Sequence, residues 1–381
     1  FWDGRSLSSM SGSTREEAMH GLIRACYSAG DDLGVLRARV LHELGKLVAY
    51  EGAFMAVSDP ETLLFTAAFS DEPLAAAGPL FLDNEFGRQP DVNRFADLAA
   101  NADPVASLDQ ATGGEWRSSP RWTEIMAPLG MGDEARVALR VEGTTWGFLC
   151  LHRTGAIPFD HRELATLRRA APHIGEAIRQ AVAAAGSTGR GADDVAAQGL
   201  IVVVDDHIAA LGGAAEYWLE QLEGGSAAIG APLPLPLLAP IRRLRVLERS
   251  AGSAPPAMIR LGTKHGSLVT VHATRLRDAG GTGPIVLTIA PAGSVERASM
   301  LLAAHGLTAA QRRVAQLVLQ GQTTRQMVLA LHISEHTVQD HLKAVFDKVG
   351  VRSRRDLVSA IMRPPVSHPA EPRNRWSTSS N

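Results

Sequence analysis

Apolar and polar positions follow two different periods in the first 185 residues of the chain. Apolar residues three and four positions apart predict helices over 16–29 and 33–49. Asp160 and Glu163 form a capping box that opens a long helix with the apolar stripe Leu164, Leu167, Ala171, Ile174, Ile178 and Val182. Short apolar runs predict strands over 53–57, 63–68, 135–141 and 145–152, with a tight turn at 142–144. We therefore predict an α+β fold for a first block, 14–185.

A second block, 193–293, follows a Gly/Ser-rich stretch at 186–191 that predicts a linker. Its pattern predicts one early strand, two helices and three later strands, at 200–204, 214–222, 238–249, 258–262, 267–276 and 285–290. The last two strands meet at a Gly-rich hairpin turn, 280–283. Separate helices followed by a run of antiparallel strands again indicate an α+β fold.

The third block, 304–363, has helix starts but no strand pattern. Capping side chains predict four starts: Thr308 with Gln311, Thr323 with Gln326, Ser334, and Ser353 with Asp356. Gly321 and Gly350 stand where the first and third helices must end. Apolar residues recur at helical spacing between these points, so we predict an all-α domain of four short helices. The tail 364–381, rich in Pro, Ser and Asn, is predicted to be disordered.

The composition limits the class of protein. A chain of 381 residues, 45% hydrophobic and 20% charged, is globular and long enough for three domains. The two cysteines, Cys26 and Cys150, show no metal-ligand spacing, which excludes a disulfide framework and favours a reduced, cytoplasmic setting. Apolar runs stay far below the roughly 20 residues of a membrane helix, so no membrane association is expected.

The charge is distributed unevenly along the chain. Formal net charge is −2, which by itself argues against binding to nucleic acid. Block 304–363, however, has nine basic and four acidic residues and a net charge of +5, so the rest of the chain carries −7. A compact basic helical domain on an acidic body suits DNA, because its cations displace counterions from phosphates.

Residues 323–349 have the pattern of a helix-turn-helix, in which the second helix, 334–349, enters the major groove of DNA. Because the apolar residues of this helix must face the core, its opposite side presents four residues to the bases: His336, Gln339, Asp340 and Lys343. Gln can pair with adenine, Lys can reach guanine, and Asp can accept a hydrogen bond from cytosine. Phosphate contacts are expected from Thr324, Ser334, Thr337, Lys348, Arg352 and Arg354.

Three runs of this block carry a specific resemblance. They are Gly306-Leu307-Thr308, the stretch 333–343 (Ile-Ser-Glu-His-Thr-Val-Gln-Asp-His-Leu-Lys), and the stretch 346–354 (Phe-Asp-Lys-Val-Gly-Val-Arg-Ser-Arg). Over about 60 residues without a gap, they closely resemble the LuxR-type helix-turn-helix domain of bacterial transcription regulators.

The LuxR resemblance implies a sequence-specific regulator, not an enzyme, with double-stranded DNA as its partner. It implies base contacts at Gln339, Asp340 and Lys343 and a last helix that often pairs two protomers, so a homodimer is expected and RNA polymerase is a candidate partner. Gln311 and Gln326 replace acids that are usual in the family, but both keep the capacity to cap a helix. Asp340 replaces a more common apolar or basic residue, so the resemblance does not define the operator sequence. It also does not define whether the protein activates or represses transcription.

The two upstream blocks show weaker resemblances. The stretch 146–153 (Trp-Gly-Phe-Leu-Cys-Leu-His-Arg), followed by Pro158-Phe159, resembles the closing part of a GAF domain. Residues 195–292 resemble a degenerate PAS domain in their order of elements. Both resemblances imply modules that bind a small ligand or dimerise. No haem, flavin or nucleotide motif is present, so no cofactor is expected and any effector is unknown. Trp116, Trp122 and Trp146 are candidates for lining a ligand pocket, with core packing as the alternative.

A phosphorylation- or metal-dependent switch is the alternative function. Residues 201–207 resemble the opening of a response-regulator receiver, where paired acids such as Asp205 and Asp206 hold Mg²⁺. That chemistry needs a phosphoacceptor Asp on a later strand, and no Asp lies between Asp206 and Asp278. We therefore expect the two acids to cap the first hairpin of the second block. His332, His336 and His341 form no regular ligand face, so no metal site is expected, and no enzyme motif is present.

Overall fold

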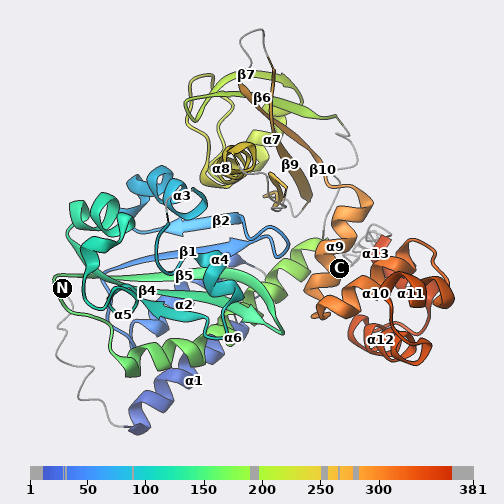
Figure 1. The fold of residues 1–381 in the computed structure, drawn as a ribbon, viewed down its shortest axis with the longest axis horizontal. Coiled ribbons are helices and arrows are strands. Elements are labelled where there is room, and N and C mark those ends of the chain that lie inside the picture. Colours follow the sequence, from blue (N-terminus) through green and yellow to red (C-terminus); the bar gives the residue numbers. More distant parts are fainter. Residues whose placement is uncertain are drawn as a thin grey trace, which may run out of the picture.

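A computed structural model describes residues 12–362 except 29, 31, 88–89, 189–196, 250–255, 265–266 and 278–282. It contains two antiparallel five-stranded sheets and a C-terminal group of helices (Figure 1). The predicted tail 364–381, part of the predicted linker and most of the turn 280–283 lie outside the described residues. No helix in the described part of the chain is long and apolar enough to cross a membrane.

The first sheet has the strand order β2-β1-β5-β4-β3. Its strands are β1 (Gly52–Ser58), β2 (Phe65–Ser70), β3 (Val105–Ser107), β4 (Met131–Val141) and β5 (Thr144–Thr154). The four strands that the sequence pattern predicts here are confirmed, and Glu142 and Gly143, both with positive φ, make the tight turn between β4 and β5. The short β3 was not predicted.

Three helices cover one face of this sheet: α1 (Gly12–Ser28), α2 (Leu33–Leu44) and α6 (His161–Thr188). Asp160 and Glu163 form the predicted capping box of α6, with Glu163 Oε2 accepting from the Asp160 backbone N–H at 2.9 Å. The stripe from Leu164 to Ile178 is buried in the cluster under these helices, so it packs on its own domain. Two predictions are wrong: α2 ends at Leu44, before 49, and α6 runs through 186–188 into the stretch assigned to a linker.

The opposite face of the sheet is covered by α3 (Gly78–Phe86) and α4 (Phe95–Ala100). Six phenylalanines pack there with ring centroids 4.3–6.3 Å apart: Phe54, Phe65, Phe81, Phe86, Phe95 and Phe148. A run of short helical turns, which the sequence pattern did not predict, completes this side: η1 (Leu74–Ala77), α5 (Leu108–Thr112), η2 (Trp116–Ser118), η3 (Trp122–Met126) and η4 (Ala127–Leu129).

The second sheet has the order β7-β6-β10-β9-β8. Its strands are β6 (Gly199–Val204), β7 (His207–Gly213), β8 (Met258–Gly262), β9 (Leu268–Arg275) and β10 (Ile285–Pro291), with helices α7 (Ala215–Gln221) and α8 (Leu235–Arg249). The sequence pattern predicted a first hairpin but no bounds for its second strand, β7, and it started α8 three residues late. Asp205 and Asp206, with φ of 46° and 64°, form the turn between β6 and β7, so the predicted hairpin is confirmed.

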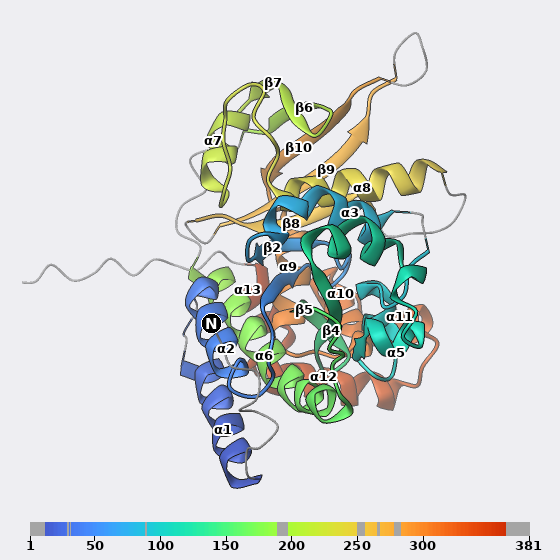
Figure 2. The same ribbon diagram turned by 90° about the vertical axis from the view of Figure 1, so that its left-hand side faces the viewer.

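The two sheet domains share one continuous apolar cluster, which runs from the phenylalanines of the first to the core of the second. Helices α3 and α8 lie between the sheets in both views (Figures 1 and 2). Arg260 of β8 donates to the Asp59 carboxylate just after β1, with Nε–Oδ2 at 2.8 Å and Nη2–Oδ1 at 2.5 Å, and both side chains are fully buried. The first two blocks therefore form one packed body.

The C-terminal helices are α9 (Ser294–Ala304), α10 (Ala309–Leu319), α11 (Thr324–Leu331), α12 (Glu335–Val349) and α13 (Arg354–Met362). The four predicted starts are confirmed, including both capping boxes and the Ser334 cap, and Gly321 and Gly350 have positive φ of 76° where α10 and α12 end. Helix α9 was not predicted.

Helix α9 contributes to two cores at once. Ala298 and Leu302 belong to the core of the helix-turn-helix domain, whereas Met300, Ala303 and Ala304 belong to the core under α1, α2 and α6. One helix therefore packs the C-terminal domain directly against the first domain, as Figure 1 shows beside the end of α6.

Candidate nucleic-acid interface

Helix α12 has one buried and one open side. Val338, Leu342 and Val345 are buried in the small core of helices α9–α13. The four predicted base contacts, His336, Gln339, Asp340 and Lys343, are all exposed. Because residues three and four apart share a side of a helix, these four lie together on the outward surface. The diameter of an α-helix with its side chains matches the width of a DNA major groove, so an exposed helix can enter it.

His336 and Asp340 are paired on that surface. Their side chains, 88% and 65% exposed, approach to 3.6 Å between Nε2 and Oδ2 across one helical turn. The contact orients the Asp340 carboxylate along the helix, but such exposed pairs add little to stability. The Asp340 carboxylate can still accept a hydrogen bond from a donor on another molecule.

The predicted phosphate contacts fall into separate groups. Ser334 Oγ accepts from the Thr337 backbone N–H at 3.1 Å, and the two hydroxyls lie 2.8 Å apart, so both are occupied in capping α12. Arg354 of α13 donates to Thr324 Oγ1 at 2.7 Å and to the Gln322 carbonyl at 3.1 Å. The structure thus brings Thr324 and Arg354 together at the start of α11. Arg352 is exposed.

Lys348, the sixth predicted phosphate contact, is bound within the protein. Its ammonium group lies 2.8 Å from Glu142 Oε2, in the β4–β5 turn, and 2.6 Å from the Gly306 carbonyl. Arg312 of α10 donates to Thr144 Oγ1 of the same hairpin at 2.9 Å, and Arg179 of α6 donates to the carbonyl of Ala304. These polar contacts therefore hold the helix-turn-helix domain against the first domain, beside the apolar contacts of α9.

A buried charged cluster lies at the opposite end of that hairpin, on the α3 face of the first sheet. Glu134 of β4 is shared between Arg121, at 2.8 Å, and Arg136, at 3.0 Å, and all three side chains are at most 1% exposed. Burial would raise the pKa of Glu134, but the two guanidinium groups outweigh it and hold that pKa well below its usual range. This cluster was not predicted from the sequence, although alternating charges at 134 and 136 inside an apolar strand are a usable signal.

His152 and Cys150 of β5 complete the cluster. Burial lowers the pKa of His152 to about 4 and raises that of Cys150 well above its usual value, so both are neutral at pH 7. Atoms of Glu134, Cys150 and His152 that are able to bind a metal lie within 4.8 Å of one another. Two neighbouring guanidiniums already occupy Glu134, so a cation would have to displace them; the residues suit an ion-pair network better than a metal site.

A small cavity adjoins this cluster. It measures about 30 Å³ and is lined by polar Arg121, Glu134 and His152 and by apolar residues that include Phe54, Phe81 and, from α8, Leu235. Arg121 Nη2 and His152 Nδ1 have no hydrogen-bond partner in the described structure, whereas Glu134 Oε1 is the atom that lies 3.0 Å from Arg136 Nε. That volume holds a water molecule, whereas drug-sized ligands need about 300 Å³ or more.

The three candidate tryptophans do not form one site. Trp116 and Trp122 lie side by side, with ring centroids 6.2 Å apart, in a cluster with Leu74 and Met126, which also line the cavity. Trp146 is fully buried on the other face of the sheet, in the cluster under α1, α2 and α6.

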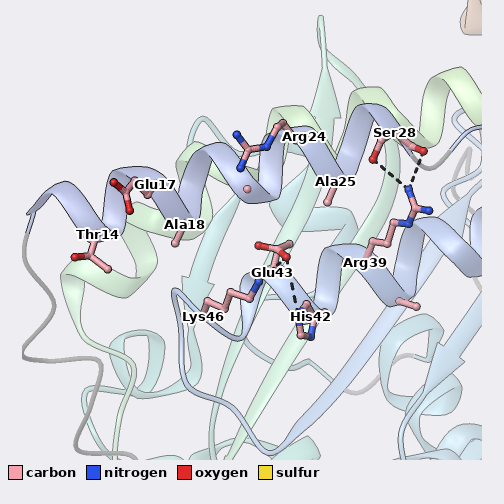
Figure 3. Close-up of a pocket in the computed structure, with 12 residues that line it drawn as sticks. Thr14, Glu17, Ala18, Arg24, Ala25, Ser28, Arg39, His42, Glu43 and Lys46 are labelled. Carbon is pink, nitrogen blue, oxygen red and sulfur yellow. Dashed lines mark hydrogen bonds and ion pairs between the residues drawn. The ribbon is translucent and has the colours of Figure 1, made fainter.

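A more voluminous hollow than this cavity lies between α1 and α2. This groove of about 840 Å³ is lined along α1 by residues such as Glu17 and Arg24 and along α2 by Arg39 and Lys46 (Figure 3). Its charges are bound locally: Lys46 lies 2.6 Å from Glu43, and Arg39 donates to the Ser28 carbonyl at 2.8 Å. It is an open surface groove, with no buried polar group aimed into it.

The acids that suggested a receiver have a structural role. Asp206 accepts two hydrogen bonds from Arg242 of α8, at 2.6 and 2.5 Å, and Asp83 of α3 lies 2.7 Å from the same guanidinium. Strand β6 is antiparallel to both neighbours. The carboxylate is thus part of the contact between the sheet domains, which leaves it poorly suited to Mg²⁺.

Residues 305–361 match the profile of bacterial regulatory proteins of the luxR family (GerE), and residues 32–178 match the GAF domain. The spore germination protein GerE of Bacillus subtilis is 37% identical over 57 residues, which are 15% of this chain and 77% of GerE. A helix-turn-helix domain preceded by a GAF domain defines a DNA-binding transcription regulator with a sensory domain. The chain belongs to the luxR family of bacterial regulatory proteins, which are typically not enzymes.

Similarity to solved structures is weaker. The chromophore-binding domain of the R. palustris bacteriophytochrome RpBphP3 has 13% identity and a TM-score of 0.30, over 44% of this chain and 61% of that one. The LBD domain of VqsR from Pseudomonas aeruginosa has 15% identity and a TM-score of 0.29, over 45% and 98%. The phage VqmA–DPO complex has 16% identity and a TM-score of 0.24, over 46% and 83%. At these TM-scores, none of the three defines a shared fold.

Proposed function

We propose that the protein is a dimeric, sequence-specific transcription regulator that inserts α12 into the major groove. The observation that carries this proposal is the open side of α12, where His336, Gln339, Asp340 and Lys343 lie together beside a buried apolar side. The net charge of +5 on block 304–363 supplies attraction to the phosphates. A DNA partner also favours a cytoplasmic location.

Phosphate contacts in this complex come from residues around α12. Thr324 and Arg354 lie at the start of α11, where backbone N–H groups and a guanidinium suit an anion. Ser334, Thr337, Lys348 and Arg352 flank the two ends of α12. Lys348 must leave Glu142 before it can serve in this way.

The proposed domains are a GAF-like sensory domain at 14–185, a PAS-like domain at 193–293 and the LuxR-type domain at 304–363. Support for a PAS-like second domain comes from strand order: numbered within each domain, both sheets have the order 2-1-5-4-3. Antiparallel sheets flanked by helices host small-ligand modules in many proteins, which is an argument by analogy.

A small-molecule effector is the proposed input. The cavity beside Arg121, Glu134 and His152 is the place that suits it, because two buried polar atoms there, Arg121 Nη2 and His152 Nδ1, lack hydrogen-bond partners in the described structure. Trp116 and Trp122 pack behind its apolar wall. The cavity must widen to admit a ligand. Leu235 of α8 forms part of the wall, so widening would also move the second domain.

Dimerisation is proposed through α13. Leu357 and Ile361 are buried, whereas Val358, Ser359 and Ala360 are exposed and leave room for a second helix. A two-fold dimer would require an operator with two related half-sites about one helical turn, or a multiple of it, apart.

The test is binding of the purified full chain to genomic DNA. Fragments recovered by selection at physiological salt should bind at least 10³-fold more tightly than random duplex of the same length. Footprints should show two half-sites, and sedimentation should give a complex with two chains. Equal affinity for selected and random DNA would contradict the proposal.

A further inference from the structure

Lys348 is placed to serve DNA phosphate and is bound to a carboxylate of another domain. It lies in the last turn of α12, on the exposed surface of the basic domain, and Glu142 holds its ammonium group at 2.8 Å. Neither side chain is deeply buried, at 31% and 51% exposure, so the pair can open in water. A carboxylate and a phosphate present similar anionic oxygens to an ammonium group.

The contact has a defined geometry, which distinguishes it from a chance surface pair. Glu142 adopts a φ of 48° at the tip of the β4–β5 hairpin, and Gly306, with a φ of 69°, brings its carbonyl to the same ammonium group. Arg312 donates to Thr144 two residues along the hairpin. Two cations of the DNA-binding domain thus contact one short turn of the GAF domain.

The pair leaves the base-facing side of α12 uncovered. His336 and Asp340 are 88% and 65% exposed in the docked arrangement. The hairpin therefore occupies a candidate phosphate contact while the candidate base contacts stay open. If the hairpin and DNA compete for Lys348, the competition should change the affinity for backbone phosphates. This part of the affinity does not depend on the DNA sequence.

We propose that Glu142 is an intramolecular competitor of DNA: its carboxylate occupies Lys348 in the free protein and is replaced there by a backbone phosphate in the complex. This inference rests on the proposed DNA-binding function. The hairpin that carries Glu142 is built from β4 and β5, whose other ends carry Glu134 and His152 beside the cavity. Movement of these strands would change how firmly the hairpin holds Lys348.

The first test compares DNA affinities of full-length variants. Glu142→Gln should tighten binding about two- to five-fold, the factor that corresponds to loss of an exposed ion pair. The gain should be equal for operator and random duplex, so the ratio of their affinities stays unchanged. In a Lys348→Gln background, Glu142→Gln should have no effect.

A matched control removes the same charge elsewhere. Glu124 is an exposed acid of the same domain, in η3, with no contact to the C-terminal helices in the described structure. Glu124→Gln should change affinity by much less than Glu142→Gln. Equal gains from both variants, or a gain from Glu142→Gln that persists without Lys348, would overturn the inference, because a general loss of negative charge would then explain the effect.

The second test needs no variant. A carbodiimide that joins carboxylates directly to amines should form an amide between Glu142 and Lys348 in the free protein, detectable by mass spectrometry of the cross-linked peptides. Saturating DNA should suppress this product. If the cross-linked product persists when all of the protein is bound to DNA, the proposed competition is wrong, although DNA binding itself stands. If the protein binds selected DNA no better than random DNA, the proposed function itself is refuted.

Discussion

Arg260 and Asp59, 201 positions apart in the sequence, form a buried ion pair that joins the two sheet domains. Arg260 also approaches Glu61 to 3.1 Å, and its backbone N–H lies 3.3 Å from Asp59 Oδ2. The two sheet domains also share one apolar cluster, so the ion pair and the cluster together pack the two domains on each other.

Removing one partner of this pair should be strongly destabilising. Asp59→Ala leaves the buried Arg260 guanidinium with only the half-exposed carboxylate of Glu61, and we expect a loss of about 3 to 5 kcal/mol in the free energy of unfolding. Denaturant titration would measure it. Arg168→Ala, at the exposed pair of Arg168 with Asp103, is the control and should cost less than about 1 kcal/mol. Similar losses of stability for Asp59→Ala and Arg168→Ala would mean that the buried pair contributes no more to stability than an exposed pair.

Lys343 should differ from Arg352 in its effect on DNA binding. If Lys343 contacts a base, Lys343→Ala weakens operator binding by about 1 to 3 kcal/mol and relaxes preference at one position of the site. Arg352→Ala should weaken operator and random DNA alike and reduce the slope of log affinity against log salt by about 1. Fluorescence anisotropy at several salt concentrations separates the two. A uniform loss for Lys343→Ala would reassign Lys343 to phosphate.

The Ser334 cap should hold the first turn of α12. Ser334→Ala removes the acceptor for the Thr337 backbone N–H, at 3.1 Å, and should cost about 1 kcal/mol. Hydrogen exchange at the first turn of α12 should become faster. Ser334→Asp keeps an acceptor there and should restore protection; if it does not, the cap is not what stabilises this turn.

His152 should make the protein sensitive to acid. Burial lowers its pKa from 6.5 to about 4 in the folded state, so the unfolded chain binds the proton first as pH falls. Stability from this residue is complete above about pH 6.5 and declines towards pH 4, by on the order of 3 kcal/mol in total.

The measurement for His152 is the difference between wild type and His152→Gln across this range. Burial raises the pKa of Asp133 to about 6, which acts with the opposite sign, so the wild-type curve alone is ambiguous. The variant should lose less stability than wild type from pH 6.5 to 4. His42→Gln, at an exposed position, controls for loss of a histidine, and parallel curves for wild type and His152→Gln would refute the prediction.

The local structure of the DNA-binding domain could be predicted from its residues alone. Capping residues such as Thr308 and Ser334 act within three positions of their partners, and the side of α12 that faces the core follows from helical periodicity. Strands such as β1 and β5 were likewise visible as apolar runs. These features depend on interactions between residues close together in the chain, so the pattern of residues along the sequence is sufficient to predict them.

The pairing of residues far apart in the chain could be seen only once the domains were packed together. It paired Asp59 with Arg260, placed Glu134, Cys150 and His152 in one buried cluster, and buried Trp146 on the side away from Trp116 and Trp122. It also bound Lys348 to Glu142, 206 positions away. Such contacts depend on how helices and sheets pack. Packing brings together charged residues that are far apart in the chain, and their separation follows no periodic pattern from which the contact could be predicted.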